Sequence, residues 1–155
     1  MSSYRNIFLF GFPRSGTKLL KNILNSHSKI EAHKVETNFF GDLYNLINSK
    51  SSKSKLDKKD IAKFSKNPYF YKDEIFGNND WINNFSDEIK YVDFIDKICF
   101  RNIPSQKIRL FKSTETKDIL KCFKLYPDAK YIYISRDVRD VCASSVKYRN
   151  RNPMV

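Results

Sequence analysis

The sequence predicts an α/β fold in which a parallel sheet is flanked by helices. Short apolar runs alternate along the chain with longer stretches in which apolar residues recur at helical spacing. This strand–helix order is typical of parallel sheets, because a crossover must return the chain to the end at which the next strand begins. The length of 155 residues fits one domain, and residues 1–155 are expected to form it.

The first half of the chain contains two expected strands and two expected helices. Residues 5–11 form a continuous apolar run that ends in glycine, which is typical of a strand buried on both faces. Apolar residues then recur at helical spacing behind Thr17, the expected N-cap: Leu19, Leu20, Ile23 and Leu24. A short extended piece is expected at residues 29–32, and a helical stretch at residues 42–47.

The last third of the chain is the most regular. Strands are expected at residues 108–111 and 131–134, and helices at residues 115–126 and 137–148. The residues expected to face the core from these two helices are Ile119, Leu120, Phe123, Val138, Val141, Cys142 and Val146. Another helix is expected to begin at Ser86, with an apolar stripe formed by Ile89, Val92, Ile95 and Ile98.

The chain is strongly basic. It has 29 Lys and Arg against 17 Asp and Glu, a net charge of +12 at pH 7. Residues 50–66 contain seven Lys and two Asp, and such a Lys/Ser-rich run predicts a solvated loop or an insertion. A positive field of this size attracts polyanions or small phosphorylated ligands, and charge alone does not choose between them.

Composition also limits the cofactors and the location. Cys99, Cys122 and Cys142 are far apart and odd in number, which predicts buried free thiols rather than disulfides. With only two histidines beside them they make a poor set of metal ligands, so no metal is expected. No apolar run approaches the roughly 20 residues of a membrane helix. The N-terminus does not read as a signal peptide, and a cytoplasmic location is expected.

The strongest motif is the turn between the first expected strand and the first helix. Residues 11–18 read GFPRSGTK, which has the G-x-x-x-x-G spacing of a nucleotide-binding P-loop. Backbone N–H groups at the helix N-terminus, with the side chains of Arg14, Ser15 and Thr17, would bind a phosphate. Thr17-Lys18 stands where a P-loop needs Lys followed by Ser or Thr, which disfavours an NTPase or a kinase. The alternative is an ordinary turn in which glycine allows close packing.

A second motif follows the last expected strand. Arg136 ends that strand and Ser144 comes eight residues later, about two helical turns further on. Both side chains can therefore bind one anion beyond the edge of the sheet, where α/β proteins place their ligands. The alternative is a capping and salt-bridge cluster of Arg136 with Asp137, Arg139 and Asp140.

Together the two motifs closely resemble those of the sulfotransferases that use 3′-phosphoadenosine 5′-phosphosulfate (PAPS). Their 5′-phosphosulfate loop reads like PRSGT, found here at residues 13–17, and their 3′-phosphate site reads like RDPRDVxxS, found here at residues 136–144. The resemblance implies a P-loop-like sheet in a three-layer sandwich of the sulfotransferase type, with PAPS as the donor. The donor-binding residues that it implies are Arg14, Ser15, Gly16, Thr17, Lys18, Arg136 and Ser144. Lys18 stands where many members have a second Thr.

A third segment, residues 31–40 (EAHKVETNFF), is similar to a stretch in carbohydrate-directed members in which Glu stands three residues before two Phe. The resemblance implies that Glu36 is the base that deprotonates the acceptor hydroxyl. The alternative is an exposed loop carboxylate beside two core residues, Phe39 and Phe40. His33 is a weaker candidate base.

The resemblance also assigns the remaining catalytic residues. Lys112, after the strand at residues 108–111, matches a Lys that reaches the sulfuryl group or its bridging oxygen in several branches. Arg14 and Lys112 would stabilise the charge on the leaving 3′,5′-bisphosphate. Thr114 stands where the branch for small phenols and steroids has its catalytic His, which favours a Glu base, with Glu115 as the second choice.

The function implied is sulfuryl transfer from PAPS to a hydroxyl of a carbohydrate or related molecule, either a small molecule or a glycan. Family members usually continue with a basic, Gly-containing loop and further helices, so the chain is expected to be incomplete at its C-terminal end. One alternative is an inactive domain that binds PAPS or its desulfated product. A basic nucleic-acid-binding module is another, although no RNA-binding motif is recognisable.

Overall fold

The computed structural model describes residues 5–34, 36–49, 55–65, 88–91, 93–95 and 106–151. The elements in chain order are β1 (Asn6–Gly11), α1 (Thr17–Asn25), β2 (Ile30–Ala32), α2 (Phe40–Asn48), β3 (Lys55–Asp57), α3 (Lys58–Ser65), β4 (Glu88–Lys90), β5 (Ile108–Ser113), the 3₁₀ turn η2 (Thr116–Asp118), α7 (Ile119–Leu125), β6 (Lys130–Ile134) and α8 (Val138–Arg151). The predicted α/β class is confirmed, and so are the four strands predicted in the first and last parts of the chain.

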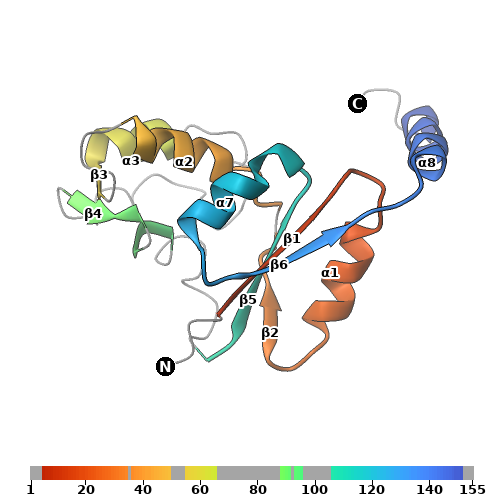
Figure 1. Ribbon diagram of the computed structural model, residues 1–155, viewed down its shortest axis with the longest axis horizontal. Coiled ribbons are helices and arrows are strands. Elements are labelled where there is room, and N and C mark those ends of the chain that lie inside the picture. Colours follow the sequence, from red (N-terminus) through yellow and green to blue (C-terminus); the bar gives the residue numbers. More distant parts are fainter. Residues whose placement is uncertain are drawn as a thin grey trace.

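The main sheet has four parallel strands in the order β2-β5-β1-β6 (Figure 1). The crossovers from β1 to β2 and from β5 to β6 run in opposite directions across the sheet, and right-handed connections then place α1 and α7 on opposite faces. The strands are parallel, so all four carboxyl ends lie at one edge. The β1–α1 turn, the segment after β2, the end of β5 and the β6–α8 turn therefore lie next to one another.

Aromatic side chains fill the core on one face of the sheet. Phe8 of β1 pairs in register with Phe111 of β5 and Tyr131 of β6. Its ring stacks on both neighbours, with centroids 4.8 Å and 5.3 Å away. Phe40 of α2 meets Phe8 edge-on at 5.1 Å. Residues in register on adjacent strands point to the same face, so the sequence of each strand directly determines this stack.

The contact between α2 and the start of α7 gives a first testable prediction. A Cβ atom on Gly41 would lie 2.1 Å from Asp118 Oδ2. Asp118 is only 5% exposed, and its Oδ1 pairs with Lys121 Nζ at 2.9 Å, so this carboxylate has little room to retreat. We expect Gly41→Ala to lower the free energy of unfolding, because an overpacking cost of roughly 1–3 kcal/mol exceeds the gain in helix propensity.

Urea unfolding followed by circular dichroism measures this effect. Asn45→Ala is the matched control, because Asn45 is exposed on the same helix and its substitution should change stability by no more than about 0.5 kcal/mol. An unchanged unfolding midpoint in Gly41→Ala would show that Asp118 moves aside at no cost.

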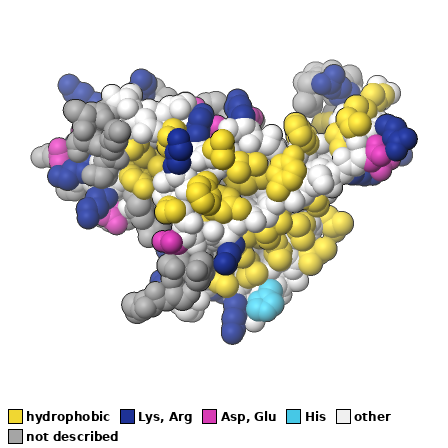
Figure 2. All heavy atoms as spheres, in the orientation of Figure 1, with side chains coloured by type: hydrophobic (Ala, Val, Ile, Leu, Met, Phe, Trp, Pro, Cys, Tyr) yellow, Lys and Arg dark blue, Asp and Glu magenta, His cyan; other side chains and the backbone are white. Residues whose placement is uncertain are grey.

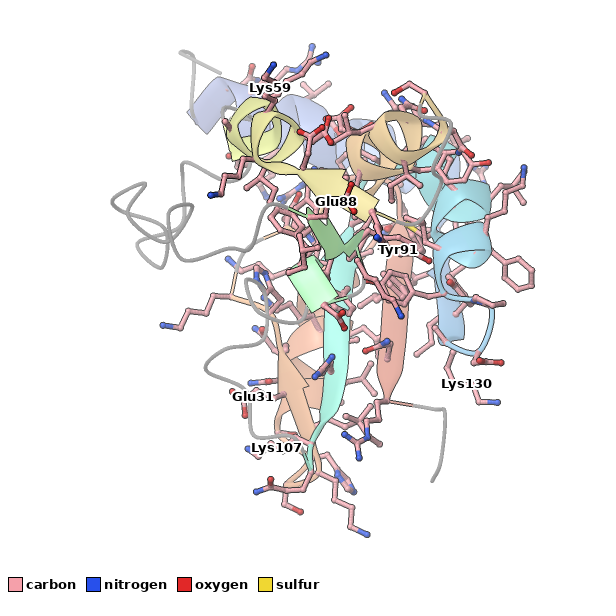
Figure 3. The ribbon with its side chains drawn as sticks, turned by 90° about the vertical axis from the view of Figure 1, so that its left-hand side faces the viewer. Glu31, Lys59, Glu88, Tyr91, Lys107 and Lys130 are labelled. Carbon is pink, nitrogen blue, oxygen red and sulfur yellow. The ribbon has the colours of Figure 1, made fainter. Side chains whose placement is uncertain are left out.

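The Lys-rich segment is more ordered than expected. Residues 55–65 form β3 and α3 rather than a loop, because Leu56 and Ile61 are fully buried while the lysines around them stay exposed. β3 pairs antiparallel with β4, and this small sheet is joined to α7 by Tyr91, whose hydroxyl donates to the Leu125 carbonyl at 3.2 Å (Figure 3). That residues 50–66 are an insertion stays a prediction.

The helix predicted from Ser86 is wrong for residues 88–90, which form β4. Ile89 is buried as expected, but on a strand, where it lies opposite Leu56. Pairing with β3 overrides the local helical pattern. Residues 91 and 93–95 are helical, while Ser86, Val92 and Ile98 lie outside the described residues.

The core-facing residues predicted for the last two helices are partly wrong. Leu120 is 74% exposed and Phe123, Val138, Cys142 and Val146 are also exposed. α7 instead turns Cys122 and Leu125 inward. Figure 2 shows hydrophobic side chains gathered over α7, β6 and α1, and Figure 1 shows α8 standing away from the sheet. Periodicity thus predicted the helices but not the faces that they bury.

Three smaller expectations have mixed outcomes. Thr17 is not a cap, because Gly16 is the N-cap and Thr17 is the first helical residue. Cys122 is buried, and burial raises the pKa of its thiol to about 12, whereas Cys142 is exposed and Cys99 lies outside the described residues. In the described part of the chain, no helix is both long and apolar enough to cross a membrane.

Candidate functional site

The carboxyl ends of the four parallel strands open into one cleft of about 590 Å³, a size typical of small-ligand sites. The residues that line it are Pro13, Arg14, Gly16, Thr17, Lys18, Glu36, Lys112, Thr114, Arg136, Ser144 and Tyr148. Every donor-binding residue predicted from the sequence is in this set except Ser15, and so are the predicted catalytic residues Glu36, Arg14 and Lys112. The cleft thus brings together residues from the β1–α1 turn, the segment after β2, strand β5, and the β6–α8 region.

The β1–α1 turn is shaped by left-handed backbone and by close packing. Gly16 has φ 99° and Arg14 has φ 70°, and Gly16 is the N-cap of α1. The backbone N–H and the hydroxyl of Ser15 both donate to the Phe12 carbonyl, at 3.1 Å and 2.6 Å. Ser15 therefore closes the turn, and its contact with a ligand stays a prediction. The turn leaves the N-terminus of α1, with its backbone N–H groups, at the cleft.

At Gly11, where the same turn begins, glycine allows close packing, which was the alternative considered for this motif. A Cβ atom there would lie 2.5 Å from Ile134 Cγ2 and 2.7 Å from Ser15 Oγ. Glycine is therefore needed for β1 to pass this close to β6 and to the turn. Close packing at Gly11 and anion binding further along the turn are compatible.

Arg14 joins the turn to α8. Its Nε donates to Ser144 Oγ at 3.1 Å, and its guanidinium lies 5.0 Å from the centroid of the Tyr148 ring. Arg136 Nη1 donates to the carbonyl of Arg14 at 3.3 Å. The two anion motifs, which are far apart in the sequence, therefore form one continuous site. Sequence reasoning missed Tyr148, although it stands four residues after Ser144 and so shares its helix face.

The salt-bridge cluster considered for the second motif is also present. Arg139 pairs with Asp137 through two bonds, at 3.0 Å and 2.7 Å, and is 88% exposed. Arg136 Nε lies 3.5 Å from Asp140 Oδ2, yet Arg136 also lines the cleft. The two arginines differ in position: Arg139 stays in the surface cluster, whereas Arg136 also lines the cleft.

Glu36 is held by donors at both carboxylate oxygens. Oε1 accepts a hydrogen bond from the Lys112 ammonium, and Oε2 accepts from Thr114 Oγ1 at 3.1 Å and from Asn38 Nδ2 at 3.5 Å. Lys112 is only 6% exposed and lies within β5, rather than after the strand as predicted. Burial alone would raise the pKa of the Glu36 carboxyl, but the hydrogen bond and charge of Lys112, with the two weaker donors, hold that pKa below its ordinary value.

The segment after β2 brings Glu36 to the end of β5 by continuing alongside that strand. The backbone N–H of His33 donates to the Leu110 carbonyl at 2.8 Å, and that of Thr37 donates to the Lys112 carbonyl at 2.8 Å. The two weaker candidate bases do not line the cleft: His33 is buried against Phe111, and Glu115 pairs with Lys117 at 3.2 Å. Of the three predicted candidates, Glu36 alone lines the cleft.

The comparison with known families agrees with this geometry. The profile of the sulfotransferase family matches residues 6–154, which include both anion motifs and Glu36. The chain belongs to the sulfotransferase family. The family resemblance and the P-loop-like parallel sheet predicted from the motifs are therefore confirmed, and the enzyme class is sulfuryl transfer in general. No curated protein matches the chain significantly.

The charges of the cleft suit a sulfotransferase, whose ligands are anions. Four cationic side chains line it against one carboxylate: Arg14, Lys18, Lys112 and Arg136 against Glu36. Lys21 of α1 does not line the cleft but adds to this field, and its ammonium donates to the Lys34 carbonyl at 3.0 Å. Burial, and the charges of Lys112 and Lys18, lower the pKa of Lys21. In the described part of the chain, no three His, Cys, Asp or Glu side chains gather as a metal site.

Proposed function

We propose that this sulfotransferase moves a sulfuryl group from PAPS to a hydroxyl of a carbohydrate or related molecule. The observation that carries the proposal is that both anion motifs and the Glu36–Lys112 pair line the same cleft. A donor with phosphate groups at two positions of one nucleoside requires two anion sites, and a transfer reaction requires a base and a cation beside them.

The proposed donor contacts follow from the two motifs. Arg14 and Lys18, with the backbone N–H groups at the start of α1, would hold the 5′-phosphosulfate, and Gly16, Thr17 and Ser15 complete that turn. Arg136 would hold the 3′-phosphate by its guanidinium fork, with the hydroxyl of Ser144 as a second donor.

The proposed chemistry is an in-line transfer. Glu36 takes the proton of the acceptor hydroxyl as its oxygen bonds to sulfur, and the bond from sulfur to the bridging oxygen of the donor breaks. Arg14 and Lys112 stabilise the negative charge on the departing 3′,5′-bisphosphate. The proposal requires no metal, because these cations supply the positive charge. The side chain of Glu36 is 45% exposed, so an acceptor can reach it.

The proposal of a carbohydrate acceptor rests on Glu36 and on its place three residues before Phe39 and Phe40. Both phenylalanines are buried in the core, as a segment that anchors a catalytic loop would require. A cytoplasmic location stays a prediction from the sequence.

Thermal unfolding with added ligands tests the donor. We expect 3′,5′-adenosine bisphosphate to stabilise the protein by about 2.7 kcal/mol when it is present at 100 times its dissociation constant. AMP and ATP at the same concentration should stabilise the protein less. Equal stabilisation by ATP would contradict the two-site donor. Transfer of labelled sulfuryl from PAPS to a panel of glycans then tests the reaction. Donor binding without any transfer would favour the inactive PAPS-binding domain.

A further inference from the structure

Asn38 lies beneath the proposed base and is bonded at both ends of its side chain. It is 8% exposed and does not line the cleft. Its Oδ1 accepts from Ser113 Oγ at 2.8 Å and from the Thr114 backbone N–H at 3.1 Å. Its Nδ2 lies 3.5 Å from both Glu36 Oε2 and Thr114 Oγ1. Asn38 therefore connects the end of β5 to Glu36.

The partners of Asn38 fix which way its amide points. The backbone N–H of Thr114 can only donate, so it must face the amide oxygen of Asn38. The ionised carboxylate of Glu36 can only accept, so it must face the NH₂ group. The two anchoring bonds on the oxygen side are the short ones, and they aim the NH₂ group at Glu36.

As a result, the two carboxylate oxygens of Glu36 have different hydrogen-bond donors. Among the described residues, Oε2 accepts from Thr114 and Asn38, while Oε1 accepts from Lys112 alone. In the proposed reaction Lys112 turns toward the negative charge of the donor. That movement would uncover Oε1 while Oε2 stays held, so the carboxylate would not rotate away from the acceptor.

We propose that Asn38 is a positioning residue which, with Thr114, fixes Glu36 Oε2 so that Oε1 takes the acceptor proton. The inference rests on the proposed function for its catalytic part. Its structural part, that Asn38 holds the Glu36 carboxylate, does not depend on the identity of the donor or the acceptor.

The variant Asn38→Asp tests the two ends of the Asn38 side chain separately. A carboxylate keeps the acceptor for Ser113 and for the Thr114 N–H, but it offers no N–H to Glu36 and adds a negative charge beside it. A neighbouring like charge raises the pKa of a carboxyl group. We therefore expect a higher pKa for Glu36. Because Oε2 loses one of its two donors and is no longer held in place, kcat should fall by roughly 10- to 100-fold at neutral pH. The affinity for 3′,5′-adenosine bisphosphate should change little, whereas the thermal midpoint should fall, because the new carboxylate is mostly buried beside a like charge.

Two measurements check this result: titration of the ¹³C-labelled Glu36 side chain by NMR, and the pH profile of kcat. The charged groups that face Glu36 are Lys112 from β5 and the region of Lys18 and Lys21 on α1. All three are lysines, so in the wild type the acid limb of the profile reports Glu36. In Asn38→Asp the new carboxylate titrates together with Glu36, and the acid limb, which then reports the pair, should move to higher pH.

Matched variants separate positioning from folding. Thr114→Val removes the other donor to Oε2 and should also raise the pKa of Glu36, whereas Asn45→Asp adds the same charge on an exposed face of α2 and should leave that pKa unchanged. An unchanged Glu36 pKa in Asn38→Asp would overturn the inference. If that variant does not fold, an unchanged Glu36 pKa in Thr114→Val would overturn it. A wild type that binds no adenosine bisphosphate would instead contradict the proposed function, and the NMR titration would still decide whether Asn38 holds Glu36.

Discussion

Glu36→Gln is expected to reduce turnover by about 10²- to 10⁴-fold, the usual contribution of a general base, without weakening donor binding. The amide has nearly the shape of the carboxylate but cannot take the acceptor proton. It also releases Lys112 from its ion pair, so this buried cation becomes more available to the anionic donor. The affinity for 3′,5′-adenosine bisphosphate should therefore equal or exceed that of the wild type. Sulfuryl transfer and titration calorimetry measure the two quantities separately.

Glu115→Gln is the matched control. It makes the same chemical change at the other carboxylate considered as a base, which pairs with Lys117 and does not line the cleft. Its turnover should be that of the wild type. Weaker donor binding in Glu36→Gln would contradict the role of Glu36 as a base, because it would show that Glu36 supports the donor site instead.

The pH dependence of kcat/KM follows from the contacts of Glu36. The pKa of Glu36 is lowered, so its carboxylate persists to more acidic pH than the ordinary value of about 4.3 would allow. The acid limb of kcat/KM, which reports the free enzyme, should lie below that value and disappear in Glu36→Gln. The stability that the Lys112–Glu36 pair contributes is present above the unfolded-state pKa and is lost as the pH falls through the lower folded-state value. An acid limb above pH 5 would contradict this assignment.

The residues of the cleft could be predicted because anion binding needs recognisable residue types at defined places. Arg14 follows the buried strand β1 and Arg136 follows the edge strand β6, and the carboxyl ends of parallel strands share one edge, so both were expected at one site. Asn38 could not be predicted in this way. Its partners Ser113 and Thr114 are about 75 residues away in the chain, and nothing in the local sequence shows that they meet.

The errors in the fold have the same origin. Residues 115–126 have helical periodicity, but only packing against α2 and the sheet decides that Cys122 is buried and Leu120 is not. Ile89 fits an apolar stripe on a helix as well as a short strand, and pairing of β4 with β3 decides between them. Local patterns predict that an element exists, and tertiary contacts decide its type when it is short and its buried face when it is helical.

Arg136→Ala should weaken the binding of 3′,5′-adenosine bisphosphate by about 10- to 150-fold, the equivalent of roughly 1.5–3 kcal/mol for hydrogen bonds to a charged group. The affinity for AMP, which lacks the 3′-phosphate, should change little. The present bonds of Arg136 are long, 3.3 Å to the Arg14 carbonyl and 3.5 Å to Asp140, so its guanidinium can turn to an anion at little cost. Arg136→Lys keeps the charge without the planar guanidinium fork. Its affinity for 3′,5′-adenosine bisphosphate should lie between those of the wild type and Arg136→Ala.

Arg139→Ala is the control for charge, because it removes the same charge only three residues from Arg136. Arg139 is 88% exposed and is held by Asp137. If the +12 field of the whole chain governed donor affinity, both variants would weaken binding alike and the loss would shrink in high salt. If Arg136 acted only by supporting the Arg14 carbonyl, AMP and the bisphosphate would lose affinity equally. A loss confined to the bisphosphate and to Arg136 fits neither explanation, and leaves direct contact with a 3′-phosphate as the cause.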